Sequence, residues 1–148
     1  MVPRRTPRET LMRVFFDTNI LVYLYDADEP DKKERACEIF ETEASAGRAL
    51  LSTQVLQEFY VTVTGKLAVP LDPKTAEEVV RNLAVLPLVQ IDAEIILAAI
   101  GRGRLLRFSF WDALIVEAAV AGGADRLLSE DLQHGQVIDD LKIENPFI

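Results

Sequence analysis

The chain has 148 residues, of which 49% are hydrophobic, with a mean hydropathy of +0.13 and a formal net charge of −8. This length and hydrophobic content are sufficient for one domain with a buried core and exclude an intrinsically disordered chain. The negative charge argues against nonspecific nucleic-acid binding through a broad basic face, although it leaves a nucleic-acid substrate open. We expect no signal peptide and no membrane span. The single cysteine, Cys37, cannot form an internal disulfide and suits a cytoplasmic protein.

The first half of the chain alternates short apolar strands with helices. Its pattern predicts a strand at 13–16, a helix at 19–26, a helix at 31–46, a strand at 49–52 and a helix at 53–64. Asp31 is the expected N-cap of the second helix. Gly47 and Gly65 are expected to end the two longer helices, because glycine is the usual residue at a helix C-terminus.

The second half continues the alternation. It predicts a helix at 74–86 ended by Pro87, a strand at 88–91, a helix from the N-cap Asp92 to 105, a helix at 110–121 opened by Ser109, a strand at 126–129 and a short strand at 142–144. Because hairpin signals are missing, the alternation predicts an α/β domain with a mainly parallel central sheet and helices on both faces. We expect one domain at 13–148, preceded by a flexible arginine-rich segment at 1–12.

Four carboxylates lie at or near points where a predicted strand gives way to a helix: Asp17, Glu58, Asp112 and Asp131. In an open α/β sheet these points fall along one edge, so the four side chains are expected to converge. Each also has an ordinary explanation. Asp17 suits a helix N-cap, and Asp112 suits a capping box with Ser109. Glu58 suits a solvated helix face, and Asp131 suits a turn.

A cluster of four carboxylates needs protons or a cation to be stable. Two carboxylates about 5 Å apart repel by roughly 3 kcal/mol at an effective dielectric of 20. Oxygen-only ligands favour Mg²⁺ or Mn²⁺, whereas Zn²⁺ would call for histidine or cysteine. The single histidine, His134, and Cys37 do not have metal-ligand spacing, and His134 is expected at the surface. The residues therefore favour a magnesium or manganese site.

Four sequence blocks carry a resemblance to a known family. They are Asp17-Thr18-Asn19-Ile20-Leu21-Val22-Tyr23, Gln57-Glu58-Phe59, Phe110-Trp111-Asp112-Ala113-Leu114-Ile115 and Leu128-Ser129-Glu130-Asp131. Taken together, in this order and with this spacing, they resemble the motif blocks of PIN-domain proteins, over almost the whole chain. Within that family the chain looks most like the VapC-type ribonuclease toxins of bacterial toxin–antitoxin pairs.

The resemblance implies a metal-dependent endoribonuclease that leaves 5′-phosphate and 3′-hydroxyl ends. Asp17 and Asp112, with Asp131 directly or through water, would bind Mg²⁺ or Mn²⁺, and Glu58 would position or deprotonate the attacking water. The resemblance further implies that Asn19 and Ser129 support the site through hydrogen bonds. The implied partners are an RNA substrate, a cognate antitoxin that blocks the site, and a second copy of the chain in a homodimer.

Several points remain open. Many relatives carry a further acidic residue shortly after the last motif aspartate, where this chain has Gln133 and His134, so one or two metals are possible. One alternative is a catalytically silent PIN-type binding module. Another is an aspartate-dependent phosphatase, which usually needs a second aspartate two residues after the first, where this chain has Asn19. Trp111 is expected in the core. A cluster of three arginines precedes the Asp112 block: Arg102, Arg104 and Arg107. These side chains are expected either to contact RNA phosphates or to be solvated.

Overall fold

The structure is a computed structural model that describes residues 12–148. The predicted flexible segment at 1–12 lies outside the described residues, apart from Met12. The described residues form six strands and six helices, in the order β1 (Val14–Phe16), α2 (Thr18–Tyr23), α3 (Pro30–Ser45), β2 (Ala49–Ser52), α4 (Thr53–Gly65), α5 (Pro73–Leu83), β3 (Leu88–Val89), α6 (Ala93–Leu106), α7 (Phe110–Ala121), β4 (Arg126–Leu128), β5 (Val137–Ile138) and β6 (Leu141–Glu144). None of the helices in this part of the chain is long and apolar enough to cross a membrane.

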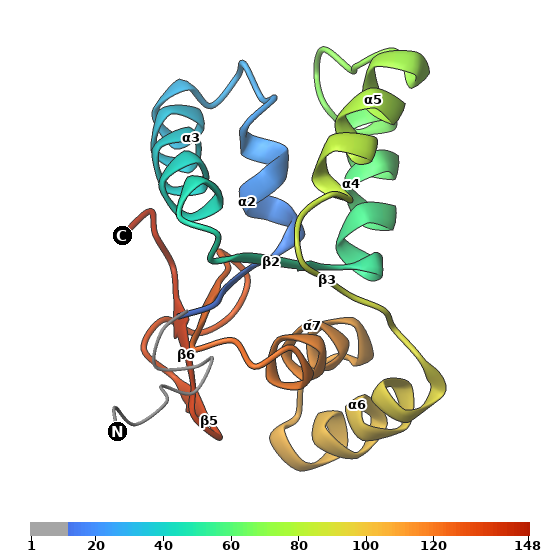
Figure 1. The fold of residues 1–148 in the computed structure, drawn as a ribbon, viewed down its shortest axis with the longest axis vertical. Helices are drawn as coiled ribbons and strands as arrows, with labels where there is room; N and C mark the ends of the chain where they lie inside the picture. Colours follow the sequence, from blue (N-terminus) through green and yellow to red (C-terminus); the bar gives the residue numbers. More distant parts are fainter. Residues whose placement is uncertain (1–11) are drawn as a thin grey trace, which may run out of the picture.

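The strands form one sheet in the order β3-β2-β1-β4-β6-β5. All neighbours are parallel except β5, which runs antiparallel to β6. Figure 1 shows α2, α3, α4 and α5 on one face of the sheet and α6 and α7 on the other. The predicted α/β class, with a mainly parallel sheet covered on both faces, is confirmed. The carboxyl ends of β1, β2 and β4 therefore share one edge, as the argument for converging carboxylates requires.

The central strands are mostly apolar because helices cover them on both sides. Each residue of β1 is at most 1% exposed, and Leu127 and Leu128 of β4 are completely buried. Helix α7 packs against this sheet through Ile115, Val116, Ala118 and Ala119, and its Ala113 and Leu114 pack against α6. Asp17 and Ser129 therefore directly follow buried strands of this layer.

Gly122 lies where the chain leaves α7 close beneath β2 and β3. A methyl group here would lie 2.6 Å from Leu50 Cδ2 and 2.7 Å from Val89 Cγ2. We expect Gly122→Ala to lower the free energy of unfolding by about 1–3 kcal/mol, because the added atom overpacks the core. Urea denaturation measures the change.

The matched control is Gly101→Ala in α6, where a methyl group would meet nothing within 4 Å. Alanine is the better helix residue, so this variant should be neutral or more stable by up to about 1 kcal/mol. Equal stability of the two variants would show that the Gly122 contact relaxes freely and that the packing argument is wrong.

Several local predictions are wrong. The helix predicted at 19–26 ends at Tyr23, and the strand predicted at 88–91 ends at Val89. Three further differences each have a short-range reason. Helix α3 begins at Pro30 with Glu29 as its N-cap, because proline suits the first helical position, and Asp31 falls in the first turn. Helix α5 ends at Leu83 and not at residue 86, because the chain turns ahead of Pro87. The β5–β6 hairpin is not predicted. It turns at Asp139, whose φ is 53°, a conformation that aspartate tolerates better than most residues.

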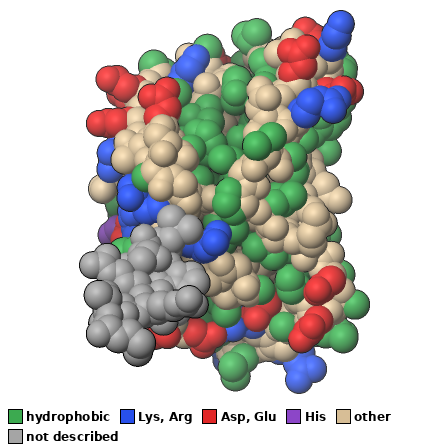
Figure 2. Space-filling model, viewed as in Figure 1, with side chains coloured by type: hydrophobic (Ala, Val, Ile, Leu, Met, Phe, Trp, Pro, Cys, Tyr) green, Lys and Arg blue, Asp and Glu red, His purple; other side chains and the backbone are tan. Residues whose placement is uncertain are grey.

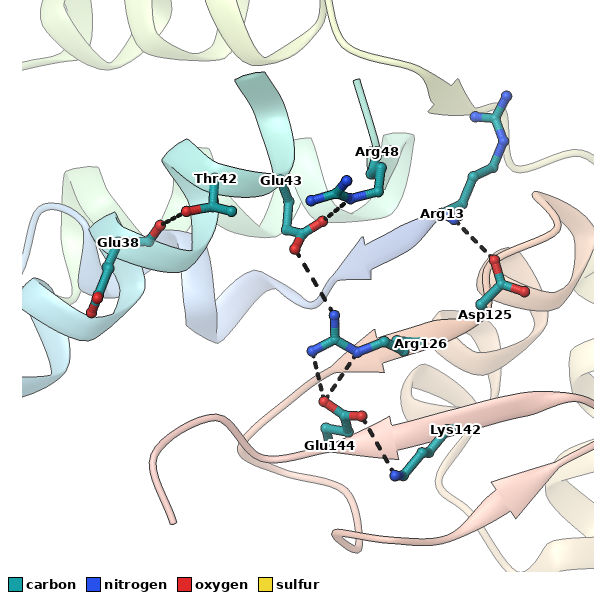
Figure 3. Close-up of polar contacts among 9 residues, drawn as sticks. All are labelled: Arg13, Glu38, Thr42, Glu43, Arg48, Asp125, Arg126, Lys142 and Glu144. Carbon is teal, nitrogen blue, oxygen red and sulfur yellow. Dashed lines mark hydrogen bonds and ion pairs between the residues drawn. The ribbon is translucent and has the colours of Figure 1, made fainter. Parts of the chain in front are cut away.

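An ion-pair network holds α3 to the amino ends of the strands (Figure 3). Glu43 of α3 lies 2.6 Å from Arg48 Nε, just before β2, and 4.0 Å from Arg126 Nη1, at the start of β4. Arg126 also pairs with Glu144 at 2.7 Å, and the hydrogen bond from Arg126 is the main reason that the pKa of Glu144 is lowered. Arg48 and Arg126 lie at the amino ends of β2 and β4, and Arg126 reaches along β4 to Glu144, the last residue of β6.

Candidate active site

Asp17 is the buried centre of the candidate site. It directly follows β1 and caps α2, with its Oδ1 accepting a hydrogen bond from the Thr18 amide at 2.7 Å. Its Oδ2 accepts a hydrogen bond from the Ser129 hydroxyl at 2.7 Å. Ser129 follows β4, so this bond joins the carboxyl ends of two neighbouring strands. Only 6% of Asp17 is exposed, which places a carboxylate where water cannot solvate it well.

The environment of Asp17 disfavours its charge. Burial raises its pKa from 3.8 to about 6, although the hydrogen bonds from Ser129 and Thr18 act in the opposite direction. The negative charges of Asp131 and Glu58 raise it further. Two of the other three candidate carboxylates therefore lie close enough to Asp17 to act on it electrostatically. A cation placed among them would relieve both the repulsion and the poor solvation.

Glu58 reaches this place from α4. The helix begins at the carboxyl end of β2, where the Ser52 hydroxyl caps it by accepting from the Val55 amide at 3.3 Å. Glu58 lies in its second turn. Its Oε1 accepts from the Thr18 hydroxyl at 2.8 Å, and its Oε2 accepts from the Gln54 side-chain amide at 3.4 Å. The two donors fix the carboxylate on the side of α4 that faces α2.

Asp131 lies in the loop after β4 and is exposed. Asn19 of α2 donates from Nδ2 to Asp131 Oδ2 at 3.0 Å, and Asn19 Oδ1 accepts from the Glu130 amide at 3.2 Å. The Asp131 amide donates to Ser129 Oγ at 3.1 Å. Asn19 thus contacts the Asp131 carboxylate and the Glu130 amide. Ser129 contacts the Asp17 carboxylate and the Asp131 amide.

Asp112 is the carboxylate that stands apart. It lies in the first turn of α7, where its amide donates to the Ser109 hydroxyl at 3.1 Å, so Ser109 is an N-cap as predicted. Among residues 12–148, no hydrogen bond or ion pair joins the Asp112 carboxylate to the other three. Its link to them is indirect, through the Gln54 amide, which donates to the carbonyl of the preceding residue, Trp111, at 3.3 Å.

The carboxylates do not form a ready-made metal cage. Within the described part of the chain, no group of three or more Asp, Glu, His or Cys side chains is arranged to hold a metal ion. The donor chemistry nevertheless fits a hard divalent cation, because all the candidate ligands are carboxylate oxygens. Each oxygen of Asp17 accepts one hydrogen bond and keeps a second lone pair. Local donors therefore orient these groups without using up their capacity to bind a cation.

A cleft of about 640 Å³ opens beside the carboxylates, between α2 and α4. It is lined by Thr18, Asn19, Val22, Tyr23, Asp26, Gln54, Gln57, Glu58, Val61, Thr62, Lys66, Trp111 and Asp131. The prediction that Trp111 belongs to the core is wrong, since 61% of it is exposed. Thr18 and Gln54, which contact Glu58, were not identified from the sequence, because only the fold brings them to that carboxylate.

A second polar cluster supports the loop that carries Asp131. The Lys32 ammonium and the Tyr23 hydroxyl both donate to the Glu130 carboxylate, and Lys32 Nζ lies 5.0 Å from the centre of the Tyr23 ring and 5.6 Å from that of Phe147. Burial acts to raise the pKa of Glu130, but the hydrogen bonds from Lys32 and Tyr23 outweigh it and keep that pKa below its ordinary value. The loop is thereby tied to α2, α3 and the C-terminal segment.

Two further residues have roles away from the cleft. Arg102 is neither solvated nor free for a phosphate, because it pairs with Glu117 and, at 3.0 Å, with Asp139. His134 is exposed, as predicted, and its Nδ1 accepts a hydrogen bond from the Asn145 amide at 3.0 Å.

Comparisons with known proteins agree with this fold. Similar solved structures include a toxin–antitoxin complex from Klebsiella pneumoniae, with a TM-score of 0.67, 17% identity and coverage of 90% of this chain and 97% of that chain. DNA-bound VapBC from Salmonella typhimurium gives a TM-score of 0.64, 21% identity and coverage of 92% and 99%. VapC20 of Mycobacterium tuberculosis, a sarcin–ricin loop cleaving toxin, gives 0.60, 16% identity and coverage of 77% and 86%.

At these identities the structural matches show the fold alone. A search of curated proteins finds no match. The sequence profile of the PIN domain, however, matches residues 14–138. This match spans most of the chain, including the segments that carry all four carboxylates, and the chain therefore belongs to the PIN domain family.

Proposed function

We propose that this PIN-domain chain is a metal-dependent endoribonuclease and the toxin of a VapC-type toxin–antitoxin pair. The observation that carries the proposal is the convergence of Asp17, Glu58 and Asp131 at the carboxyl ends of neighbouring strands. Asp17 is buried there, and its burial and the two neighbouring negative charges raise its pKa. Such a group is unfavourable in the free chain and becomes favourable when a cation binds beside it. Perturbed carboxylates in a cleft are a frequent sign of a functional site.

The proposed roles of the residues are those that the PIN-domain motifs imply. Asp17, Asp112 and Asp131 would hold the cation, Mg²⁺ or Mn²⁺, which when bound polarises a phosphate and lowers the pKa of a water molecule. Ser129 orients Asp17, and Asn19 orients Asp131.

Glu58 is the proposed general base. Thr18 and Gln54 hold its carboxylate in place, and it lines the cleft, where a substrate has access. It would orient a water molecule and accept its proton as the water oxygen attacks phosphorus in line with the bond to O3′. That bond breaks, O3′ takes a proton from solvent, and the products carry a 5′-phosphate and a 3′-hydroxyl.

RNA cleavage under defined metal conditions tests the activity. Labelled single-stranded RNA incubated with the chain and Mg²⁺ or Mn²⁺ should yield fragments with 5′-phosphate ends, and excess EDTA should stop the reaction. Glu58→Gln should retain the fold and lose about 10²–10⁴-fold in rate, the usual contribution of a general base. Cleavage that continues in EDTA, or fragments with cyclic phosphate ends, would exclude this mechanism.

The proposed protein partner is a cognate antitoxin. The same unfavourable carboxylates that attract a metal ion also attract a basic side chain, so an antitoxin that blocks the site should insert one near Asp17. The chain purified from its native host should carry a small protein that suppresses RNA cleavage when it is added back. A chain that purifies alone, with full activity, would contradict a toxin role.

The proposed assembly is a homodimer, and α6 is the surface that favours it. This helix leaves several large apolar side chains exposed, among them Leu97 at 68% and Leu105 at 81%. Contiguous exposed apolar surface often marks an interface. Leu97→Glu should shift the mass measured by light scattering from two copies to one, and an unchanged mass would place the interface elsewhere.

One observation favours a second candidate, a catalytically silent PIN-type binding module. The Asp112 carboxylate does not contact the other three, and the described residues do not form a metal cage. A silent module would bind neither Mg²⁺ nor Mn²⁺ at millimolar concentration, whereas the proposed nuclease must bind one of them.

A further inference from the structure

Trp111 is the only tryptophan in the chain, and it lies on the wall of the cleft with 61% of its surface exposed. Its ring packs against a neighbouring aromatic ring. The Phe110 ring meets it edge to face, with centroids 5.1 Å apart, and Phe110 itself packs against the small apolar cluster between α6 and α7. A single exposed apolar residue is ordinary on a protein surface. The position of Trp111 relative to Glu58 is what makes it informative.

Gln54 connects the backbone of Trp111 to Glu58. This glutamine is 4% exposed, and its Nε2 donates both to the Trp111 carbonyl at 3.3 Å and to Glu58 Oε2 at 3.4 Å. Rotating the amide by 180° would place its oxygen against these two acceptors, so they fix its orientation. Gln54 Oε1 is left without a hydrogen-bond partner among the described residues, an unfavourable arrangement for a buried acceptor. Gln54 therefore ties the backbone of Trp111 to the proposed general base, and both side chains line the same cleft.

The charge around the cleft limits how RNA can be bound. Among the described residues that line it, Lys66 is the one cationic side chain, and the formal net charge of the chain is −8. On the face shown in Figure 2, the described Lys and Arg side chains are interspersed with Asp and Glu and do not form a continuous basic surface. Phosphate contacts alone supply little affinity to such a protein. Stacking of bases on aromatic rings does not depend on a basic surface, and every base offers a face for it.

We propose that Trp111 is a stacking platform for an unpaired nucleobase of RNA next to the scissile phosphate. This inference rests on the proposed ribonuclease function and deepens it by naming the substrate class, RNA that is unpaired at the cleavage site. A base within a duplex has both faces covered by its neighbours and cannot stack on the ring. The protein therefore selects single-stranded or looped RNA.

The test uses the full chain carrying Glu58→Gln, so that RNA binds without being cut. Because Trp111 is the only tryptophan, stacking should quench the whole tryptophan fluorescence of the protein. Titration with a single-stranded RNA oligonucleotide should quench it, and the same strand annealed to its complement should not. Polarisation of a labelled oligonucleotide gives the dissociation constant for variants without tryptophan.

Substitutions separate stacking from other roles of the ring. Trp111→Ala should weaken RNA binding about 5- to 100-fold, the range measured for loss of one base–aromatic stack, and Trp111→Phe should retain most of the affinity. In the chain with Glu58 intact, Trp111→Ala should raise KM and leave kcat nearly unchanged. Tyr60→Ala is the matched control, since Tyr60 is an exposed aromatic residue of α4 outside the cleft.

Distinct results overturn distinct claims. Unchanged RNA affinity in Trp111→Ala, or equal quenching by single strand and duplex, overturns the platform while leaving the nuclease intact. If Trp111→Ala changes the mass measured by light scattering, the ring contacts a second copy of the chain. That result also overturns the platform. Quenching by RNA without cleavage by the unsubstituted chain leaves the platform standing and removes the proposed catalysis. A chain that neither binds nor cleaves RNA overturns both.

Discussion

Asp17→Asn should abolish metal-dependent RNA cleavage, with a loss on the order of 10³-fold or more. The substitution removes the buried charge that attracts the cation while preserving the shape of the side chain. Asparagine can still accept from the Thr18 amide through its oxygen and place its amide nitrogen near Ser129 Oγ, so the end of β1 should keep its structure. Single-turnover cleavage at saturating Mg²⁺ measures the loss.

The control for this experiment is Asp28→Asn, the same chemical change at an exposed position. It should retain full activity, since Asp28 lies outside the cleft. An Asp17→Asn protein that keeps a tenth or more of the original rate would show that Asp17 is only a helix N-cap. That was the ordinary explanation available from the sequence.

The second large effect of Asp17→Asn is on stability. The substitution that abolishes RNA cleavage should make the metal-free fold more stable. The pKa of Asp17 is about 6 in the folded chain, above its ordinary 3.8, so the folded state binds a proton more tightly than the unfolded state. Stability contributed by this group is complete below pH 4 and is lost as the pH rises from about 4 to 6. The difference of about two pKa units corresponds to about 3 kcal/mol at pH 7.

Metal-free Asp17→Asn should therefore be more stable than the parent chain at pH 7 by up to about 3 kcal/mol, and equally stable at pH 4. For a chain of this length the gain corresponds to a rise in melting temperature on the order of 5–10 °C. Comparing the variant with its parent at each pH cancels the titration of all other groups. A stability difference between variant and parent that stays constant from pH 4 to 7, or a less stable variant at pH 7, would contradict this prediction. Either result would show that ionised Asp17 does not destabilise the fold.

Added Mg²⁺ should then narrow this difference in stability, since the parent chain gains more stability from binding the ion than the variant does. The same residue thus weakens the empty fold and strengthens the loaded one. Such a trade-off is expected where a charged group is kept for function and not for folding.

The features predicted correctly from the sequence are those decided by neighbouring residues. Asp92 and Ser109 are N-caps whose side chains accept from amides three residues later, and the boundaries of β2 and α7 are as predicted. The parallel sheet follows from the alternation of strands and helices. It also accounts for the approach of Glu58 and Asp131 to Asp17, because the carboxyl ends of three neighbouring strands share one edge.

The features of the site that were missed depend on contacts distant in sequence. Helical periodicity indicates a buried face for α7, but Trp111 falls on the side that α2 and α4 leave open. The Lys32–Glu130 ion pair joins residues whose partnership exists only in the folded chain. Burial of the Gln54 amide beside Glu58 likewise depends on how α4 meets α7. Periodicity gives the face of a helix but not the neighbour that covers it.

The separation of Asp112 from the other carboxylates bears most directly on the proposed chemistry. Its amide is engaged with Ser109, and its carboxylate makes no bond to Asp17, Glu58 or Asp131 among the described residues. The capping role and the ligand role are compatible, because capping here uses the Asp112 backbone and the Ser109 hydroxyl. The Asp112 carboxylate stays available to a cation.

Isothermal titration calorimetry of Mg²⁺ and Mn²⁺ into the metal-free chain at pH 7 tests the central claim directly. The account predicts saturable binding to the parent chain and binding at least about 10-fold weaker to Asp17→Asn and to Asp112→Asn, because each variant lacks one charged ligand. Equal binding by the parent and the Asp17→Asn protein, or no binding by the parent chain, would contradict the claim that these carboxylates are a metal site.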